Sequence, residues 1–275
     1  MADAPVAVVT GGASGFGFGL AACCAQRGMR VALLDLDASR SSDQAAALAG
    51  EHGVEAFGLG VDVAKADTVD AAAGAVDERW GRADVVFSNV GVQLFGAVEA
   101  FTDDEWRWVL DVNVVGSARV ARAFLPLLRR APHGRLAFTT SSSVLDPASR
   151  LGGYQATKFA VWGLAETLRL ELRDEPVTVS TIFPSGMITR HLETSADAQP
   201  DHLRRDIGSE ADFTDMVESN PGMTTALATP EEAAANVIEA VLAGERYVIT
   251  HGDLVDPVTS RCADLRGAAE VARDR

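Results

Sequence analysis

The sequence is poor in cysteine: three cysteines occur in 275 residues. Cys23 and Cys24 are neighbours, and neighbouring residues of a helix point in different directions and form no ordinary disulfide. We therefore expect buried or nearly buried thiols in a reducing compartment. The cysteines also lack the spacing of metal ligands, so no metal site is expected.

The sequence also lacks the features that direct a chain to a membrane or to nucleic acid. No apolar run is long enough to span a bilayer, and no charged-then-apolar leader precedes the first strand-like run. The formal net charge of −15 opposes nonspecific binding to nucleic acid or to an anionic membrane. We expect a soluble cytoplasmic protein with neither as a partner, in which local groups hold any anionic cofactor.

What the sequence does contain is a regular alternation of strand-like and helix-like segments, with 47% apolar residues to form a core. Such alternation implies parallel strands joined by right-handed crossovers. It predicts an α/β fold, a Rossmann-type doubly wound, seven-stranded parallel sheet with helices on both faces, as one domain over residues 1–275. The expected strands are Val6–Thr10, Arg30–Asp35, Val54–Val61, Ala83–Ser88, Arg135–Thr140, Val177–Phe183 and Tyr247–Thr250. The expected helices are Gly15–Gly28, Ser39–His52, Ala66–Trp80, Asp103–Arg130, Gly153–Arg173 and Pro230–Ala243.

Two segments lack a regular pattern. Residues 185–229 are polar and mixed in charge, and they follow the carboxyl end of a strand, where such sheets bind ligands. They form either a substrate lid with short helical pieces or an oligomer contact or mobile insert. The charged tail after Asp253 is either a C-terminal arm or ordinary surface.

A glycine-rich turn follows the first expected strand: residues 10–17 read TGGASGFG. Glycine lets backbone N–H groups approach an anion, and the start of the next helix adds unpaired donors and a positive dipole end. The turn therefore predicts a site for a dinucleotide pyrophosphate. A tight strand–helix turn without a ligand is the alternative.

Asp35 closes the second strand, eighteen residues after Gly17. A carboxylate there can accept hydrogen bonds from both hydroxyls of an adenosine ribose, and it repels a 2′-phosphate. Neither Leu36 nor Ser14 is basic, so NAD is favoured over NADP. A helix-capping or surface aspartate is the alternative.

Two further strand ends carry polar residues. Asp62 follows the third strand and either accepts from the adenine amino group or caps the next helix. The turn Ser88–Gly91, which contains Asn89, either contacts the cofactor or is an ordinary Asn/Gly turn.

Tyr154 and Lys158 are four residues apart on an expected helix and share a face. A phenol has a pKa of about 10, and a nearby ammonium lowers that pKa by favouring phenolate. Ser141, thirteen residues upstream of Tyr154, ends the fifth strand, where its hydroxyl can hold a substrate oxygen while Tyr154 moves the proton. Taken alone, the Tyr–Lys pair is also compatible with surface residues.

In these motifs the chain resembles the classical short-chain dehydrogenases/reductases. The resemblance covers about Pro5–Thr189 and resumes near Pro230–Thr250. It implies an NAD-dependent enzyme that interconverts a secondary alcohol and its ketone. The motifs are Thr10-Gly11-x-x-x-Gly15-x-Gly17, Asp62, Asn89-x-Gly91, Asn113, Ser141, Tyr154-x-x-x-Lys158, and Pro184 with Thr189.

The resemblance also implies a role for each of four residues. Tyr154 is the acid/base, and Ser141 orients the carbonyl or alcohol. Lys158 binds the nicotinamide ribose and lowers the tyrosine pKa, and Asn113 stabilises a helix kink whose main-chain carbonyl holds a water of the proton relay. The implied cofactor contacts are Gly11, Ser14, Gly15, Phe16, Gly17, Asp35, Asp62, Val63, Asn89, Val90, Gly91, Tyr154, Lys158, Pro184, Gly186, Met187 and Thr189.

The chain departs from the family pattern in two places. The usual Asn-Asn-Ala-Gly turn is Ser88-Asn89-Val90-Gly91, and the usual Pro-Gly is Pro184-Ser185-Gly186. By position, substrate contacts come from a mostly apolar set, which predicts a hydrophobic or aromatic secondary alcohol or ketone. These contacts are Gln93, Leu94, Ser143, Val144, His191 and Leu192.

Two other functions remain open at this point: a catalytically silent dinucleotide sensor or scaffold, and an epimerase or dehydratase with bound NAD. The chain keeps both Tyr154 and Lys158, which silent relatives commonly lose, and its length does not match the extended subgroup that epimerises. The resemblance further implies a homodimer or homotetramer in which Asp103–Arg130 and Gly153–Arg173 pair between subunits.

Overall fold

The computed structural model describes residues 4–204, 209–220, 224 and 226–275. Its centre is a seven-stranded sheet in the order β3-β2-β1-β4-β5-β6-β7, and every paired neighbour is parallel. This confirms the predicted doubly wound α/β fold. The strand order reverses between β1 and β4, and ligands bind such sheets at the carboxyl ends of the strands beside that point. The strands are β1 (Val6–Thr10), β2 (Arg30–Asp35), β3 (Ala56–Gly60), β4 (Val85–Ser88), β5 (Gly134–Thr139), β6 (Val177–Phe183) and β7 (Tyr247–Ile249).

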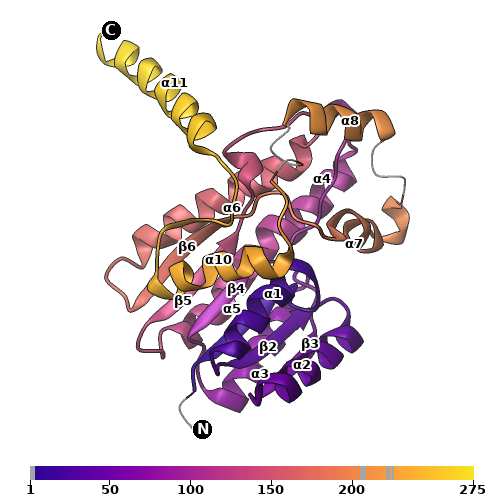
Figure 1. Ribbon diagram of the computed structural model, residues 1–275, viewed down its shortest axis with the longest axis vertical. Helices are drawn as coiled ribbons and strands as arrows, with labels where there is room; N and C mark the ends of the chain where they lie inside the picture. Colours follow the sequence, from indigo (N-terminus) through magenta and orange to yellow (C-terminus); the bar gives the residue numbers. More distant parts are fainter. Residues whose placement is uncertain (1–3, 205–208, 221–223, 225) are drawn as a thin grey trace.

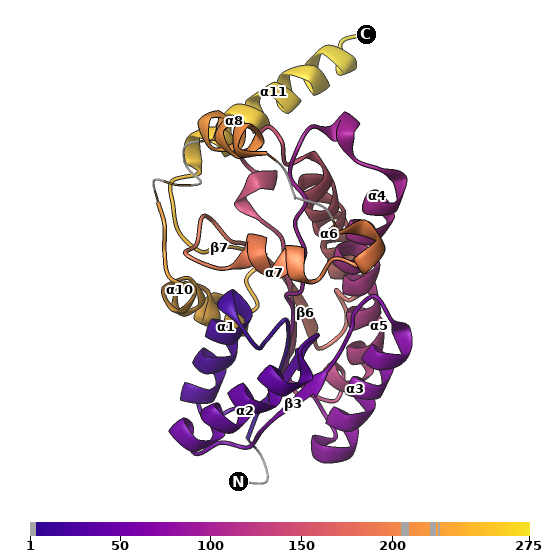
Figure 2. The same cartoon turned by 90° about the vertical axis from the view of Figure 1, so that its right-hand side faces the viewer.

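Helices cover both faces of the sheet (Figures 1 and 2). One face carries α1 (Gly15–Gln26), α2 (Ala38–His52) and α10 (Pro230–Ala243), and the other carries α3 (Ala66–Trp80), α5 (Gly116–Leu128) and α6 (Gly152–Glu171). Alternate residues of each strand supply the two apolar cores, because successive side chains of a strand point to opposite faces. In β1, Val6 and Val8 join the α3/α5/α6 core, while Ala7 and Val9 join the α1/α10 core.

The expected helix Asp103–Arg130 is interrupted. It consists of α4 (Asp103–Leu110), a π-helical turn (Asp111–Val115) and α5. A π-turn adds one residue to a helix and releases a carbonyl from its regular partner. The interruption contains Asn113, the residue for which a helix kink was predicted.

The described parts of residues 185–229 contain the expected short helical pieces: α7 (His191–Asp197), a 3₁₀ turn (Asp201–Leu203) and α8 (Glu210–Ser219). The tail forms α11 (Val255–Arg273), which projects from the body as an arm and has no buried residue (Figure 1). No helix in the described ranges is long and apolar enough to cross a membrane. Cys23 and Cys24 are buried and free, as expected.

Candidate active site

A cavity of about 1410 Å³ lies at the carboxyl ends of the strands. One side of its wall is formed by residues at or just after the carboxyl ends of β1, β2, β4, β5 and β6. The other side is formed by α7 and α8. The cavity brings together every predicted cofactor residue. These are Gly11, Ser14, Gly15, Phe16, Gly17, Asp35, Asp62, Val63, Asn89, Val90, Gly91, Tyr154, Lys158, Pro184, Gly186, Met187 and Thr189.

The glycine turn between β1 and α1 needs its glycines. Gly11 and Gly15 have φ angles of +63° and +52°, in the left-handed region that L side chains rarely adopt. A Cβ on Gly17 would lie 2.0 Å from the Gly11 carbonyl oxygen. The backbone therefore folds back on itself and leaves the N-terminus of α1 facing the cavity, where it can receive an anion.

Asp35 lies at the next strand end and is fixed by the turn. Its carboxylate accepts hydrogen bonds from the backbone N–H of Ala13 at 3.0 Å and of Asp37 at 3.3 Å. Asp62 accepts from the Ala64 N–H and pairs with Lys65, so it caps the following segment while lining the cavity. Arg40, a basic residue outside the motif positions 14 and 36, also lines this end of the cavity and was not predicted.

Asn89 joins three strands at the centre of the site. Its amide donates to the Thr10 carbonyl at 3.2 Å, and its side-chain oxygen accepts from the Thr139 hydroxyl at 3.0 Å. Two residues later, a Cβ on Gly91 would meet the Lys158 ammonium at 2.8 Å. The Ser88–Gly91 turn is therefore packed between β1, β5 and α6, despite its departure from the family pattern.

Ser141, Tyr154 and Lys158 converge beside this turn. The Ser141 side chain lies close enough to the Tyr154 phenol to lower its pKa. The Ser141 hydroxyl oxygen also accepts from the Ser143 hydroxyl at 2.9 Å, which leaves its own proton free to donate. The buried Lys158 ammonium donates to the Thr139 carbonyl at 3.0 Å and lies 5.5 Å from the centre of the Tyr154 ring.

The protonation of this group corrects one prediction. Burial raises the pKa of Tyr154 to about 12, and the nearby Ser141 side chain only partly offsets this rise. Burial also lowers the pKa of Lys158 to about 8. Desolvation is the main cause of both shifts. In the protein alone, the lysine therefore does not make the phenol acidic.

Asn113 anchors the loop after β4, at Val92. Its side-chain oxygen accepts from the Val92 N–H at 2.8 Å, and its amide donates to the Val92 carbonyl and the Thr157 hydroxyl, both at 2.9 Å. The Asn113 carbonyl accepts from the Ser117 hydroxyl at 2.7 Å.

The extra residue in Pro184-Ser185-Gly186 is held from the end of β7. The Ser185 N–H donates to the Thr250 hydroxyl at 3.0 Å, and its hydroxyl donates to the His251 carbonyl at 2.7 Å. The His251 ring lies 2.8 Å from the Gly186 carbonyl oxygen. Thr189 then reaches across the cavity to within 3.9 Å of where a Cβ on Gly15 would lie.

On the substrate side, four of the six predicted residues line the cavity: Gln93, Ser143, His191 and Leu192. The structure corrects the other two. Leu94 is 2% exposed and belongs to the apolar core on the face of the sheet that α3, α5 and α6 cover. Val144 is fully buried, and its carbonyl accepts from Arg261 of α11.

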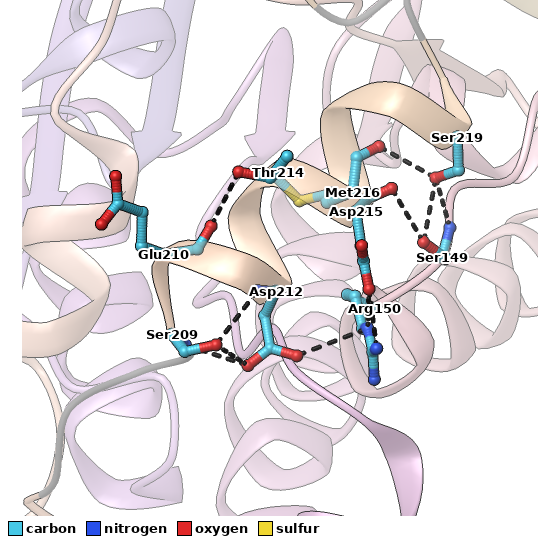
Figure 3. Close-up of polar contacts among 9 residues, drawn as sticks. All are labelled: Ser149, Arg150, Ser209, Glu210, Asp212, Thr214, Asp215, Met216 and Ser219. Atoms are coloured by element: carbon cyan, nitrogen blue, oxygen red, sulfur yellow. Dashed lines mark hydrogen bonds and ion pairs between the residues drawn. The ribbon is translucent and has the colours of Figure 1, made fainter.

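Sequence reasoning missed the apolar wall formed by α8 and the segment before α6. Leu151, Phe213, Met216 and Val217 line the cavity there. Figure 3 shows how α8 is attached: Arg150 pairs with Asp215 at 2.7 Å and Asp212 at 3.4 Å, and Ser149 bonds to Ser219. These partners are more than sixty residues apart in sequence, so no local pattern indicates them.

The residues present fit a dinucleotide. The glycine turn offers backbone donors where no side chain fits, Asp35 presents a carboxylate one strand away, and Thr189 faces the turn from across the cavity. No group of three or more His, Cys, Asp or Glu that could hold a metal occurs among the described residues.

Comparison with known proteins gives a family match. The sequence model of the short chain dehydrogenases matches residues 5–200. Among curated proteins, the chain is 33% identical to D-threitol dehydrogenase of Mycolicibacterium smegmatis over 68% of this chain and 72% of that protein. It is 32% identical to the short-chain reductase NovJ of Streptomyces niveus over 85% of each.

Solved structures agree with this match. A short-chain dehydrogenase/reductase of Burkholderia phymatum in complex with NAD has a TM-score of 0.87 at 29% identity, covering 96% of this chain and 95% of that chain. L-Sorbose reductase of Gluconobacter frateurii, complexed with NADPH and L-sorbose, has a TM-score of 0.76 at 25% identity, covering 92% and 97%.

Proposed function

Because the chain belongs to the short-chain dehydrogenase family, and is therefore an oxidoreductase of that family, we propose that it is an NAD-dependent secondary-alcohol dehydrogenase and ketone reductase. The observation that carries the proposal is the convergence of Ser141, Tyr154 and Lys158 in one cavity with the glycine turn. When bound, a nicotinamide dinucleotide supplies the hydride acceptor for oxidation and the hydride donor for reduction.

Tyr154 moves the proton and Ser141 holds the substrate oxygen. Ser141 accepts from Ser143, so its hydroxyl proton is directed to the substrate oxygen or to Tyr154. In reduction, Tyr154 donates its proton to the carbonyl oxygen, and its raised pKa keeps that proton in place at neutral pH. In oxidation, Tyr154 must lose this proton before it accepts one from the alcohol.

Lys158 and Asn113 support this transfer. Lys158 is held by Thr139 and Gly91 within reach of the tyrosine ring, where it binds the nicotinamide ribose. Its ammonium, with a pKa lowered to about 8, becomes neutral more easily than an exposed lysine and so exchanges protons near neutrality. Asn113 is a positioning residue that fixes Val92 and the π-turn beside it.

NAD is the proposed cofactor. Asp35 faces the adenosine end with a fixed carboxylate, and Asp37 follows it in the same wall. Both repel a 2′-phosphate, whereas Arg40 in that wall attracts it. We expect Asp35→Asn to raise kcat/KM with NADP by about tenfold relative to NAD, because one unfavourable charge contact is removed. An unchanged cofactor ratio would contradict the role of Asp35.

The proposed substrate is a secondary alcohol or ketone with an apolar body. Leu151, Leu192 and Met216 form an apolar cluster with the edge of Tyr154, and Phe213 extends this wall. An apolar group packed there places the carbinol carbon toward Ser141 and Tyr154.

NADH formation from a panel of secondary alcohols at alkaline pH, with NADP as control, tests the proposal. Tyr154→Phe removes the proton carrier without changing the packing, so we expect kcat to fall by at least about a hundredfold while NADH binding persists. Unchanged turnover in Tyr154→Phe would overturn the mechanism. Tight NADH binding with no turnover of any alcohol or ketone would favour a silent sensor instead.

A homo-oligomer is part of the proposal. Two segments are expected to pair between subunits: the interrupted helix that runs from α4 through the π-turn to α5, and α6. Both segments carry exposed apolar residues. Leu110 and Val115 are 39% and 43% exposed, and Phe159 and Leu170 are 42% and 55% exposed. Sedimentation analysis measures the assembly directly.

A further inference from the structure

Two polar side chains in the cavity wall have no partner in the part of the chain that the structure describes. Gln93 is 7% exposed and lines the cavity, but its side-chain amide makes no hydrogen bond to any described residue. The His191 ring lines the same cavity and meets the Tyr154 ring edge to face, with the centroids 6.1 Å apart. Its ring nitrogens also lack a hydrogen bond among these residues.

The two side chains are held in place by their backbones. The Gln93 N–H donates to the Ser195 hydroxyl at 3.0 Å, and that hydroxyl donates to the His191 carbonyl at 2.7 Å. Ser195 is buried and so links the start of α7 to the loop after β4. Asn113 fixes the preceding residue, Val92, through two hydrogen bonds. A site fixed in this way does not have to be ordered when a ligand arrives.

The Gln93 amide and the His191 ring nitrogens are not sealed from solvent: they keep accessible surface in the cavity. A ligand in the cavity can therefore form the hydrogen bonds that no described residue supplies. Gln93 follows Gly91, which contacts Lys158, and His191 contacts Tyr154. His191 therefore lies next to Tyr154, and Gln93 lines the same cavity and is tied to the His191 backbone through Ser195.

The charges of the surrounding residues define the ligand further. Gln93 is neutral, and burial together with the charge of Lys158 lowers the pKa of His191 to about 4, so His191 is neutral near pH 7. The Lys158 ammonium is already bonded to the Thr139 carbonyl. These two groups match a hydroxyl or carbonyl, which donates and accepts, better than an ionised carboxylate.

We propose that the substrate carries a neutral hydroxyl or carbonyl on the carbon next to the one that exchanges hydride, and that Gln93 and His191 bind this group. The proposal rests on the proposed function and narrows it to vicinal diols and α-hydroxy ketones with an apolar remainder. Leu192 and Met216 supply the wall for that remainder.

Binding of three compounds with the same ring tests the proposal: racemic 1-phenylethane-1,2-diol, 1-phenylethanol and mandelate. Each is titrated by calorimetry into the protein with saturating reduced dinucleotide, NADH or NADPH as the cofactor assay selects. We expect the diol to bind at least about tenfold more tightly than 1-phenylethanol, which lacks the second hydroxyl and leaves the polar groups unpaired. Equal affinity, or binding of neither, overturns the proposal, and tighter binding of mandelate overturns the neutral assignment.

Variants assign the preference to the two residues. Gln93→Leu and His191→Phe keep most of the side-chain volume, and each should reduce the diol preference by at least about threefold. Gln26→Leu and His133→Phe change exposed residues outside the cavity and should leave the preference unchanged. A preference that survives in both cavity variants overturns the assignment.

The same compounds separate this proposal from the proposed function. Diol preference in binding without turnover of any compound supports the polar subsite and overturns the dehydrogenase reaction. Turnover of 1-phenylethanol and the diol with equal kcat/KM supports the dehydrogenase and overturns the polar subsite.

Discussion

The two sides of the cavity are held by different interactions. On the strand side, Asn89, Asn113 and Lys158 bond to the backbone or side chains of neighbouring strands and helices, and most of these atoms are buried. On the other side, α8 is attached by one buried side chain, Met216, and by the polar contacts of Arg150 and Ser149 at the surface. Buried, sheet-anchored networks resist opening, whereas exposed ion pairs contribute little to global stability. We therefore expect the strand side to hold the site residues in fixed positions and the helical side to adapt more easily.

Substitution of Gly17 by Ala should produce the largest effect, because it strikes the strand side at its tightest point. The new Cβ would lie 2.0 Å from the Gly11 carbonyl oxygen and 2.7 Å from the Asn89 amide nitrogen. Backbone atoms cannot move aside cheaply, so we expect a loss of about 2–4 kcal/mol in the free energy of unfolding. Urea denaturation measures this loss, and dinucleotide titration should show that binding is abolished.

The control is Gly50→Ala in the last turn of α2, where a Cβ meets nothing within 4 Å. There the helix propensity of alanine should stabilise the protein by roughly 0.5–1 kcal/mol. If both variants behaved alike, crowding at Gly17 would not explain the turn.

Asn113→Ala should have the next largest effect. It removes one acceptor and two donors from a buried site and leaves the Val92 N–H and carbonyl unpaired. We expect a loss of about 2–4 kcal/mol in unfolding free energy and a lower kcat, because the Gln93 segment is released. Ser117→Ala, which removes only the hydroxyl bonded to the Asn113 carbonyl, should cost about 1 kcal/mol. Equal costs would argue against the central place of Asn113.

Gly17 and Asn113 also show what a sequence can predict. The glycine turn, Asn89 and the Tyr154–Lys158 pair belong to short motifs whose spacing brought them together, and the family resemblance added Asn113. The orientation of Leu94 and Val144 depends on tertiary packing, and the Arg150–Asp215 pair joins distant segments, so neither was predictable. The raised pKa of Tyr154 was missed because desolvation depends on burial, which spacing does not reveal.

The stability of the protein should depend on pH through His191, the residue of α7 that packs against Tyr154. The folded-state pKa of about 4 lies below the ordinary value of 6.5. The folded state therefore disfavours protonation of His191. The contribution of neutral His191 to stability is fully present above pH 6.5 and is lost as the pH falls toward 4. The loss is at most about 3.5 kcal/mol, since one pKa unit corresponds to about 1.4 kcal/mol.

His191→Gln should remove this part of the acid sensitivity, because glutamine does not titrate. Denaturation curves between pH 7.5 and 4.5 should converge for the two proteins on the high-pH side and separate below pH 6 after correction for any constant offset. His133→Gln, which changes an exposed histidine, should follow the wild type throughout. A wild-type curve parallel to that of His191→Gln would show that the histidine is solvated instead.

Arg150→Met should change global stability least and function selectively. Arg150 bonds to Asp215 through two nitrogens, at 2.7 and 3.0 Å, and reaches Asp212 at 3.4 Å. The pair is partly exposed, so its loss should change the unfolding free energy by less than about 1 kcal/mol. We expect faster amide exchange over Glu210–Ser219 and a higher KM, because the helix that carries Met216 and Phe213 is released from its clamp.

Two further variants separate the clamp from its side effects. Arg150 has a φ of +62°, unfavourable for any residue but glycine, so Arg150→Gly removes the same ion pair while relieving about 1 kcal/mol of backbone strain. It should therefore be more stable than Arg150→Met and equally impaired in KM. Arg107→Met breaks an exposed pair with Asp104 on α4 and should change neither KM nor exchange in α8. The three variants are compared by their KM and by their free energy of unfolding. If KM varied with the free energy of unfolding, whether or not Arg150 was present, α8 would not depend on this clamp.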